Sequence, residues 1–385
     1  MVFFYYVACF FLIYWLICIV WVSRCIYIWN TMSWSRIESE CKKRTISKAA
    51  LHAFQRLDSH EYHRLTKICL SIFSILFVFP LRGLILIILC ALSAIFSLFL
   101  PQIHDGNVSR RCFLLRLCVC NKIVSCFMSV LLTVMGLIIV DNFPEASRKK
   151  IPQDEIIVSN HVSILDIIYF MSRLGLPSFV SKSSVAKLPL ISRFSNAMNC
   201  IYVNRDSVEN RSQALESIHN RQRNISNGES LNTLILFAEG TTSNGHTILP
   251  FKNGAFSTLQ KVTVVVLFYP CTYFHPAFDI LDPMVYITLL VASPVPCRLY
   301  TTWIFNVSPE ILPPKNSDAQ CVKHFKNKVY NEALCVLQKQ QTKYYGFNTT
   351  SSEFLQDLLF MSQDKWGDSL KVKKQLYDCI HNKGS

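Results

Sequence analysis

The feature that most constrains this chain is a set of long apolar runs in its first 140 residues, because more than half of the whole sequence, 51%, is hydrophobic and such runs are typical of chains that lie partly in lipid. The first run, Val2 to Val22, has 21 almost uninterrupted apolar residues. About 20 apolar residues in a helix cross the hydrocarbon of a bilayer. The run has no basic start and no small-residue cleavage site of the kind that marks a signal peptide. We therefore expect a transmembrane anchor over residues 1–23.

Two further apolar stretches carry interruptions or flanking charge. The stretch Ile68 to Leu100 is longer than one span, and Pro80-Leu81-Arg82-Gly83 interrupts it. Proline removes a helix hydrogen bond, and an arginine at mid-bilayer costs about 3 kcal/mol on insertion scales. We expect an interfacial helix, a bend and a helix from Leu84 to Phe99, or else a re-entrant hairpin. The stretch Ile123 to Val140 either crosses the bilayer or lies half-immersed, so residues 68–141 are predicted to be membrane-embedded or interfacial helices.

Charge and cysteine content narrow the class of partner. The formal net charge is +14, but the basic residues fall in short runs beside the apolar segments, namely Lys42-Lys43-Arg44, Arg110-Arg111 and Arg148-Lys149-Lys150. This placement suits anionic headgroups better than nucleic acid, and no nucleic-acid partner is expected. Residues 24–67 are predicted to form a basic amphipathic cytosolic segment. The 16 cysteines are scattered, and no Cys-x-x-Cys occurs, so we interpret them as reduced apolar residues and expect no metal site.

The residue pattern of the sequence changes near Asp141, where the long apolar runs end. From there to about Gln338, short β-rich runs alternate with helical patterns, which is typical of an α/β domain built on a largely parallel sheet. We place this domain at residues 142–338 and a polar basic tail, to which we attach no chemistry, at residues 339–385. The expected strands are Glu155–Ser159, Ser178–Ser181, Cys200–Asn204, Thr233–Phe237, Val262–Tyr269 and Arg298–Phe305, and the expected helices are Ile164–Leu174, Val208–Asn224 and Ala319–Leu337.

A histidine and an aspartate follow the first of these strands. In Ser159-Asn160-His161-Val162-Ser163-Ile164-Leu165-Asp166 an apolar run enters a polar turn and then a helical pattern. If the turn folds back over the helix start, the Asp166 carboxylate can accept a hydrogen bond from the His161 ring and leave the other ring nitrogen free to take a proton. That pair would be a general base for a hydroxyl. A histidine in a turn followed by an N-capping aspartate is the alternative, and these eight residues do not decide between the two.

Two more polar clusters follow predicted strands. Arg205 comes after the run Ile201–Val203, where a fixed guanidinium would suit a phosphate, although taken alone a surface pair with Asp206 explains it better. The run Leu234–Phe237 leads into Ala238-Glu239-Gly240-Thr241-Thr242-Ser243-Asn244-Gly245, which offers an acid, two glycines and three hydroxyls. The amides of such a turn can cradle an anionic headgroup. An ordinary β-turn with Asn-Gly chemistry is the alternative.

Together these clusters resemble the four ordered motifs of the glycerolipid acyltransferase superfamily, which acylates glycerol-phosphate and lysophospholipids from acyl-CoA. The matching residues are Asn160-His161-x4-Asp166, Arg205 after an apolar strand, Glu239-Gly240-Thr241, and an apolar strand that ends at Pro270. The resemblance covers roughly Leu76 to Leu337. It implies a glycerol-phosphate acyltransferase-like α/β fold, with a largely parallel sheet flanked by helices and with N-terminal transmembrane and interfacial helices.

Some details are similar to the lysophosphatidylcholine and lysophosphatidylethanolamine acyltransferase branch, namely Phe79-Pro80-Leu81-Arg82, Glu239 to Gly245, and Phe251-Lys252-Asn253-Gly254-Ala255-Phe256. Lysophosphatidate acyltransferases commonly carry an arginine after Glu-Gly-Thr, where this chain has Thr242. The resemblance therefore implies an acyl-CoA:lysophospholipid O-acyltransferase that acts at the sn-2 hydroxyl, with acylation of lysophosphatidate to phosphatidate as the alternative. A non-catalytic membrane scaffold is the competing class, and the presence of both His161 and Asp166 disfavours it. The chain has no Gly-x-Ser-x-Gly elbow of a serine hydrolase.

The resemblance implies a role for each matched residue. His161, oriented by Asp166, is expected to deprotonate the glycerol hydroxyl, which attacks the acyl-CoA carbonyl without an acyl-enzyme. His161 is also expected to point toward Arg205 and Glu239. Acyl-CoA is a co-substrate, no cofactor is expected, and the partners are acyl-CoA, a lysophospholipid and membrane lipids. The family implies an endoplasmic reticulum location with the catalytic domain facing the cytosol. The residues expected to bind substrate are Asn160, Lys182, Arg205, Glu239, Gly240 and Thr241.

Overall fold

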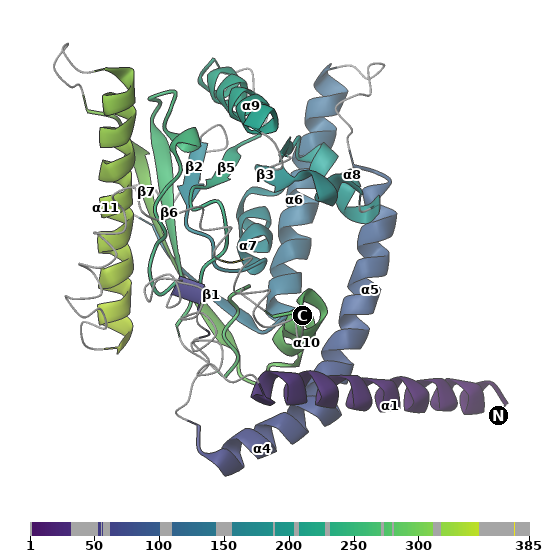
Figure 1. The fold of residues 1–385 in the computed structure, drawn as a ribbon. Coiled ribbons are helices and arrows are strands. Elements are labelled where there is room, and N and C mark those ends of the chain that lie inside the picture. The colour runs from purple at the N-terminus through teal and green to yellow at the C-terminus, as the bar shows by residue number, and fades with distance from the viewer. Residues whose placement is uncertain are drawn as a thin grey trace.

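A seven-stranded sheet forms the centre of the fold, in the strand order β1-β7-β6-β2-β5-β3-β4 (Figure 1). The computed structural model describes residues 2–31, 53–54, 56, 62–100, 110–143, 156–187, 189–203, 208–227, 232–270, 273–278, 281–310, 317–345 and 373. The strands are β1 (Leu137–Asn142), β2 (Ile156–Ser159), β3 (Ser178–Lys182), β4 (Ile201–Val203), β5 (Leu234–Phe237), β6 (Val262–Phe268) and β7 (Cys297–Val307).

Every neighbouring pair of strands runs parallel except β6 and β7, which run antiparallel. Strands β6, β2, β5, β3 and β4 therefore end at one common edge of the sheet. All residues of β2 and β6 are buried, as expected for parallel strands that are covered on both faces and rich in Val and Ile. The prediction of a largely parallel sheet flanked by helices is confirmed.

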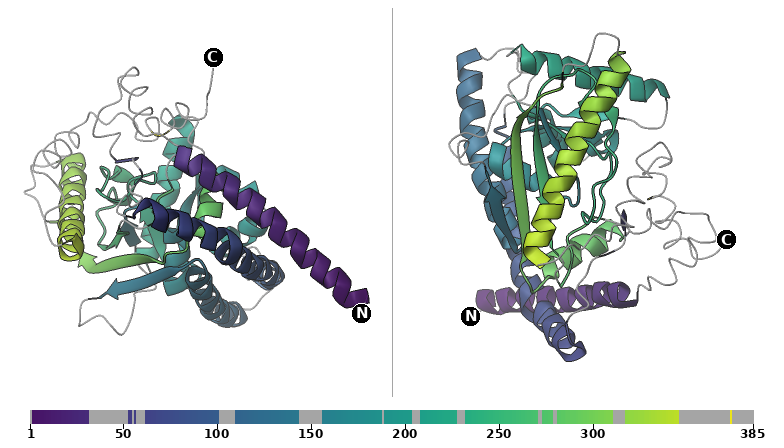
Figure 2. Two further views of the ribbon diagram at one scale, coloured as in Figure 1. Left: turned by 90° about the horizontal axis from the view of Figure 1, so that it is seen from below. Right: turned by 90° about the vertical axis from the view of Figure 1, so that its left-hand side faces the viewer.

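Alternate side chains of the central strands enter two separate hydrophobic cores, one on each face of the sheet. Ile157, Ile235 and Val265 join the core beneath α6 (Arg110–Val134), α7 (Leu165–Leu174) and α10 (Pro283–Ala292). Their neighbours in sequence join the core beneath α9 (Val208–Ser226) and α11 (Asp318–Tyr345). Figure 2 shows α11 lying along the sheet on the side opposite to α6. Helix α8 (Pro189–Ala197) lies between β3 and β4 in the chain.

The apolar N-terminal part forms α1 (Val2–Thr31), α4 (Arg64–Phe73), a π-helical turn η1 (Ser74–Val78) and α5 (Phe79–Ser97). Among the described residues, three helical stretches are long and apolar enough to cross a membrane by length and composition, namely Tyr5–Thr31, Arg64–Ser97 and Leu117–Val134. The two figures show α1 steeply inclined to α6. Two helices so inclined cannot both lie along the normal of one flat bilayer, so at least one of them is tilted or lies along the surface.

The expected change of direction in this stretch is present, since α4 and α5 run in clearly different directions (Figure 1), but the expected start of the second helix at Leu84 is wrong, because α5 begins at Phe79. α4, η1 and α5 follow one another without a break, and Pro80 occupies the first turn of α5, where the missing N–H costs least. The wider π-helical turn just before it accommodates the change in hydrogen bonding. The guanidinium of Arg82 donates from Nη1 to the carbonyls of Val291, at 3.1 Å, and Ser293, at 2.7 Å. These carbonyls lie at the carboxyl end of α10, where a cation is favoured.

The third apolar stretch is not one helix. Helix α6 ends at Val134, and Gly136 adopts a left-handed backbone with φ +76°, which glycine takes without strain. β1 begins directly after it and pairs with β7, so the sheet starts before the predicted boundary at residue 142. The first apolar helix is also longer than predicted, since α1 continues past residue 23 to Thr31.

Candidate active site

His161 and Asp166 are hydrogen-bonded at the end of β2. The distance from His161 Nδ1 to Asp166 Oδ2 is 2.9 Å, so the turn does fold back over the start of α7. The same carboxylate oxygen accepts the main-chain N–H groups of Val162, at 2.6 Å, and Ser163, at 2.8 Å. A carboxylate at the N-terminus of a helix is favourable. Because Oδ2 acts as the acceptor, the hydrogen of the His161 ring lies on Nδ1, and the lone pair lies on Nε2.

Tyr269 completes the hydrogen bonding of the aspartate. Its hydroxyl donates to Asp166 Oδ1 at 2.7 Å, and it directly follows β6, the strand beside β2. Burial, followed by the nearby Asp166 carboxylate, raises the pKa of Tyr269 well above its ordinary value, so the hydroxyl stays protonated and remains a donor. The sequence interpretation did not single out Tyr269. A tyrosine immediately before the motif residue Pro270 was the available signal.

An aromatic ring supports the histidine from one side. The rings of His161 and Phe237 are stacked with centroids 3.9 Å apart and 12° between their planes. Phe237 is the last residue of β5 and stacks in turn on Phe179 of β3. The His161 side chain is 16% exposed whereas that of Asp166 is fully buried. The imidazole is thus held by Asp166 and Phe237, and part of it is open to solvent.

Glu239 lies beneath the main chain of His161 and is fully buried. One carboxyl oxygen accepts the His161 N–H at 2.9 Å, and the other accepts the Leu249 N–H at 3.0 Å. Burial raises the pKa of Glu239 to about 8, and the Asp166 carboxylate adds to this, whereas the hydrogen bonds from His161, Leu249 and Ser243 oppose it. Since both oxygens are occupied by main-chain amides, Glu239 is placed to position His161. This differs from the headgroup contact expected from the sequence.

The turn after Glu239 packs closely on the His161 turn. Gly240 and Gly245 adopt left-handed conformations with φ of +73° and +71°, and the Ser243 N–H donates to the His161 carbonyl at 2.9 Å. A Cβ at position 245 would lie 2.6 Å from Cγ2 of Val162. Glycine at position 245 is therefore required both by the backbone conformation and by the space available.

Asn160 links the end of β2 to β6. Its Nδ2 donates to the Leu267 carbonyl at 2.9 Å, and its Oδ1 accepts the Leu267 N–H at 2.8 Å. Both polar atoms of this buried side chain are used in this way, so the amide extends the pairing of the two strands. The structure therefore gives Asn160 a supporting position, where the sequence had suggested a contact with substrate.

Of the two remaining predicted binding residues, the structure describes only Lys182. Lys182 is exposed at the end of β3, which is separated from β2 by β5. Two strand spacings amount to about 10 Å. Arg205 follows β4 and lies outside the described residues. The structure thus brings together His161, Asp166, Asn160, Glu239, Gly240 and Thr241, and it shows no contact of Lys182 with them among the described residues.

Two apolar helices contact the chain that leaves the site after β6. Trp29 of α1 packs edge-on against the rings of Tyr273 and Phe274, with centroids 5.5 and 5.7 Å away. The Ser71 hydroxyl of α4 is hydrogen-bonded to the Tyr273 hydroxyl at 2.8 Å. The candidate membrane helices are therefore packed only a few residues along the chain from Tyr269.

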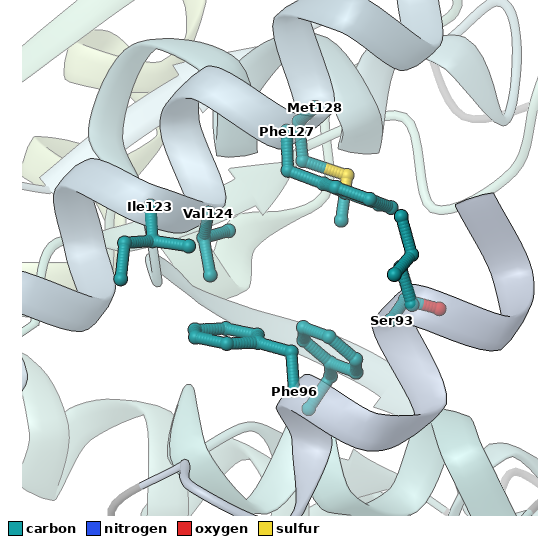
Figure 3. Close-up of a pocket in the computed structure, with 8 residues that line it drawn as sticks. Ser93, Phe96, Ile123, Val124, Phe127 and Met128 are labelled. Atoms are coloured by element: carbon teal, nitrogen blue, oxygen red, sulfur yellow. The ribbon is translucent and has the colours of Figure 1, made fainter.

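An apolar cavity of about 200 Å³ lies between α5, α6 and α8. None of the motif residues lines it. The hydroxyl of its one polar lining residue, Ser93, is used within α5 in a bond to the Cys90 carbonyl, so the wall is apolar in effect. Figure 3 labels six of its lining residues, namely Ser93, Phe96, Ile123, Val124, Phe127 and Met128.

Comparisons with known proteins agree with this site. Residues 141–273 match the Acyltransferase family. The chain is 40% identical over 152 residues to the lysophospholipid acyltransferase LPEAT1 of Arabidopsis thaliana, an alignment that covers 39% of this chain and 38% of that protein. It is 33% identical over 118 residues to a lysophosphatidylcholine acyltransferase of Drosophila melanogaster, covering 31% of this chain and 21% of the relative. The alignments thus span well under half of either relative.

A solved structure is also similar to the chain. The 1-acyl-sn-glycerophosphate acyltransferase PlsC from Thermotoga maritima aligns with a TM-score of 0.47 and 15% identity, covering 72% of this chain and 97% of that one.

The region that matches the Acyltransferase family contains His161, Asp166 and Glu239, the residues that form the site described above. Over part of its length, the chain is similar to lysophospholipid acyltransferases, including lysophosphatidylcholine acyltransferases.

Proposed function

We propose that this protein is a membrane-bound O-acyltransferase that moves an acyl chain from acyl-CoA to the free sn-2 hydroxyl of a lysophospholipid, such as lysophosphatidylcholine or lysophosphatidylethanolamine. The observation that carries the proposal is the hydrogen-bonded pair of His161 and Asp166, set above buried Glu239 in a domain that matches the Acyltransferase family. The similarity to lysophospholipid and lysophosphatidylcholine acyltransferases supports this class of acceptor.

The pair supplies the proton transfers that the reaction needs. His161 Nε2 takes the proton of the glycerol hydroxyl while the hydroxyl oxygen attacks the thioester carbonyl. When the tetrahedral intermediate collapses, the C–S bond breaks and His161 Nε2 donates this proton to the departing CoA sulfur. The products are the new ester and the free CoA thiol. The Asp166 carboxylate stabilises the transient imidazolium. A positioned general base of this kind contributes about 10²- to 10⁴-fold to the rate.

The geometry divides the remaining motif residues into two groups. Asn160 and Glu239 are buried and fully used in holding the main chain around His161, so they act as positioning residues. We assign the phosphate of the acceptor to Arg205, which follows β4 in the sequence, with Lys182 at the end of β3 as the weaker candidate. Guanidinium groups bind phosphate oxygens in a fixed bidentate geometry, which lysine lacks.

The apolar helices would keep the site at a membrane surface. Both the lysophospholipid and the product have hydrocarbon chains that stay in lipid, whereas the CoA headgroup needs water. Contacts of α1 and α4 with Tyr273 place these helices beside the segment that follows Tyr269, which supports this arrangement. We assign the protein to the endoplasmic reticulum membrane with the domain facing the cytosol, where acyl-CoA is present.

The test is transfer of labelled oleoyl-CoA to a panel of acceptors by membranes that contain the full chain. Lysophosphatidylcholine and lysophosphatidylethanolamine should be acylated faster than lysophosphatidate. His324→Ala, an exposed histidine on α11, serves as the matched control and should retain activity, whereas His161→Ala should lose it. Failure of the wild-type protein, folded and in membranes, to acylate any of the lysophospholipids would overturn the proposal, and a clear preference for lysophosphatidate would overturn the headgroup assignment.

A further inference from the structure

A lysine far along the chain lies against the turn that follows the Glu-Gly-Thr motif. The ammonium of Lys373 donates hydrogen bonds to the carbonyl of Thr242, at 3.1 Å, to the Thr242 hydroxyl, and to the carbonyl of Phe278, at 2.7 Å. Lys373 is the only residue beyond position 345 among those that the structure describes. It is 131 residues from Thr242 in the sequence.

The two residues that bind the ammonium belong to segments that flank the His161 turn. Ser243, next to Thr242, donates its N–H to the His161 carbonyl at 2.9 Å, and Phe278 donates its N–H to the Val162 carbonyl at 2.9 Å. The Thr242 hydroxyl also donates to the Phe278 carbonyl at 2.6 Å. One cation therefore joins the segment after β5 to the segment after β6, and each of these segments is hydrogen-bonded to the turn that carries His161.

The surroundings of the ammonium indicate a structural cation rather than a substrate-binding one. An ammonium has three N–H donors, and Thr242 and Phe278 supply three acceptors. The rings of Phe54 and Phe278 lie 5.8 and 5.5 Å from Lys373 Nζ, within the range of cation–π attraction. With its donors already used by the protein, Lys373 has none left for a phosphate of the substrate.

The N-terminal part of the chain reaches the same turn. Phe54 is fully buried, and the carbonyl of its neighbour Ala53 accepts the Asn244 N–H at 2.9 Å. Asn244 lies two residues after Thr242. A residue that precedes the acyltransferase domain and one that follows it thus meet on the turn between Glu239 and Gly245.

We propose that Lys373 is a positioning residue of the active site, which holds the turn Glu239–Gly245 and the segment at Phe278 in register with the His161 turn. This inference rests on the proposed function, since the turn supports the proposed general base. Loss of the ammonium should loosen both segments and displace His161 from its working geometry. A misplacement of about 1 Å can lower the rate of the chemical step by about 100-fold. For the smaller displacement expected here, kcat should fall by about 10-fold, while the KM for acyl-CoA changes less than about 2-fold.

The first experiment compares amide hydrogen exchange in full-length wild type, Lys373→Met and Lys343→Met. Lys343 is an exposed lysine near the end of α11 and is the matched control. Peptides that contain Ser243, Asn244 and Phe278 should exchange faster in Lys373→Met and at the wild-type rate in Lys343→Met. Equal exchange of these peptides in Lys373→Met and wild type would overturn the proposal. This readout needs no catalytic activity, so its failure is distinguishable from failure of the proposed function.

The second experiment is a double-mutant cycle on kcat with Thr242→Val, which removes the hydroxyl acceptor and keeps the shape of the side chain. Residues that act through one contact give non-additive effects. The double variant should therefore lose less activity than the product of the two single losses. Additive effects, or a Lys373→Met variant that raises KM by about 10-fold with kcat unchanged, would assign Lys373 a role other than positioning.

Discussion

Replacing Glu239 with glutamine should change how the stability of the protein depends on pH. In the folded protein, burial raises the pKa of Glu239 from 4.5 to about 8. The folded state therefore holds this proton more tightly than the unfolded chain does. Folding takes up a proton between these two pH values, so the contribution of Glu239 to stability is greatest below about pH 4.5 and falls as the pH rises toward 8.

The size of the effect follows from the two pKa values. Between pH 5 and pH 7 the linkage relation gives a loss of roughly 2–3 kcal/mol of unfolding free energy for a carboxyl whose pKa moves from 4.5 to about 8. Glutamine does not titrate, so position 239 in this variant contributes no such change of unfolding free energy with pH. It also turns an NH₂ group toward one of the two N–H donors, of His161 and Leu249, at a cost of about 1–3 kcal/mol at every pH.

Denaturation of detergent-solubilised protein, followed by tryptophan fluorescence, measures this difference. Glu239→Gln should be less stable than wild type at pH 5, and the gap should narrow by about 2–3 kcal/mol by pH 7. Glu310→Gln, the same change at an exposed carboxylate paired with Lys328, should show no such narrowing. A gap between Glu239→Gln and wild type that stays constant or widens with rising pH would show that Glu239 is ionised in the fold and would refute the reasoning.

Two other substitutions test the contacts around the histidine. Tyr269→Phe removes the hydroxyl that donates to buried Asp166. This variant should have an unfolding free energy about 1.5–3 kcal/mol lower than wild type and a reduced kcat with little change in KM. Unchanged denaturation and kinetics would show that the hydroxyl is dispensable. Gly245→Ala adds a Cβ 2.6 Å from Val162 at a left-handed position, and the backbone strain alone costs about 1–2 kcal/mol. The denaturation midpoint should fall, combination with Val162→Ala should restore part of it, and Gly254→Ala, whose added Cβ would lie 3.5 Å from its nearest neighbour, should be nearly neutral.

The sequence predicts the strands because buried parallel strands are dense in Val, Ile and Leu, as in Val262–Phe268. It does not predict β1, because Leu137–Asn142 continues the apolar run of α6 and only Gly136 marks the change. The start of α5 was likewise mispredicted, at Leu84 instead of Phe79, since a π-helical turn preceding Pro80 leaves no signature in composition.

Some contacts of the candidate site could likewise be predicted from the sequence, and others could not. The contact between His161 and Asp166 is local, so their spacing at the start of a helix suggested it as one of two alternatives, and the ordered motifs that follow favoured it. The contacts of Tyr269 and Phe237 depend on the strand order, which places β6 and β5 on either side of β2. Residue patterns alone do not determine that order. The contact of Lys373 with Thr242 joins residues 131 positions apart in the sequence. The residues around Lys373 give no local sign of it.

The most direct test of the account is the activity of His161→Ala in the full chain, assayed with labelled oleoyl-CoA and lysophosphatidylcholine in membranes. The account predicts a loss of about 10²- to 10⁴-fold in kcat with hydrogen exchange of the sheet unchanged, because the His161 ring contributes to chemistry while its main chain carries the structural bonds to Glu239 and Ser243. Transfer by the folded His161→Ala protein at the wild-type rate would contradict the central claim that this histidine is the general base.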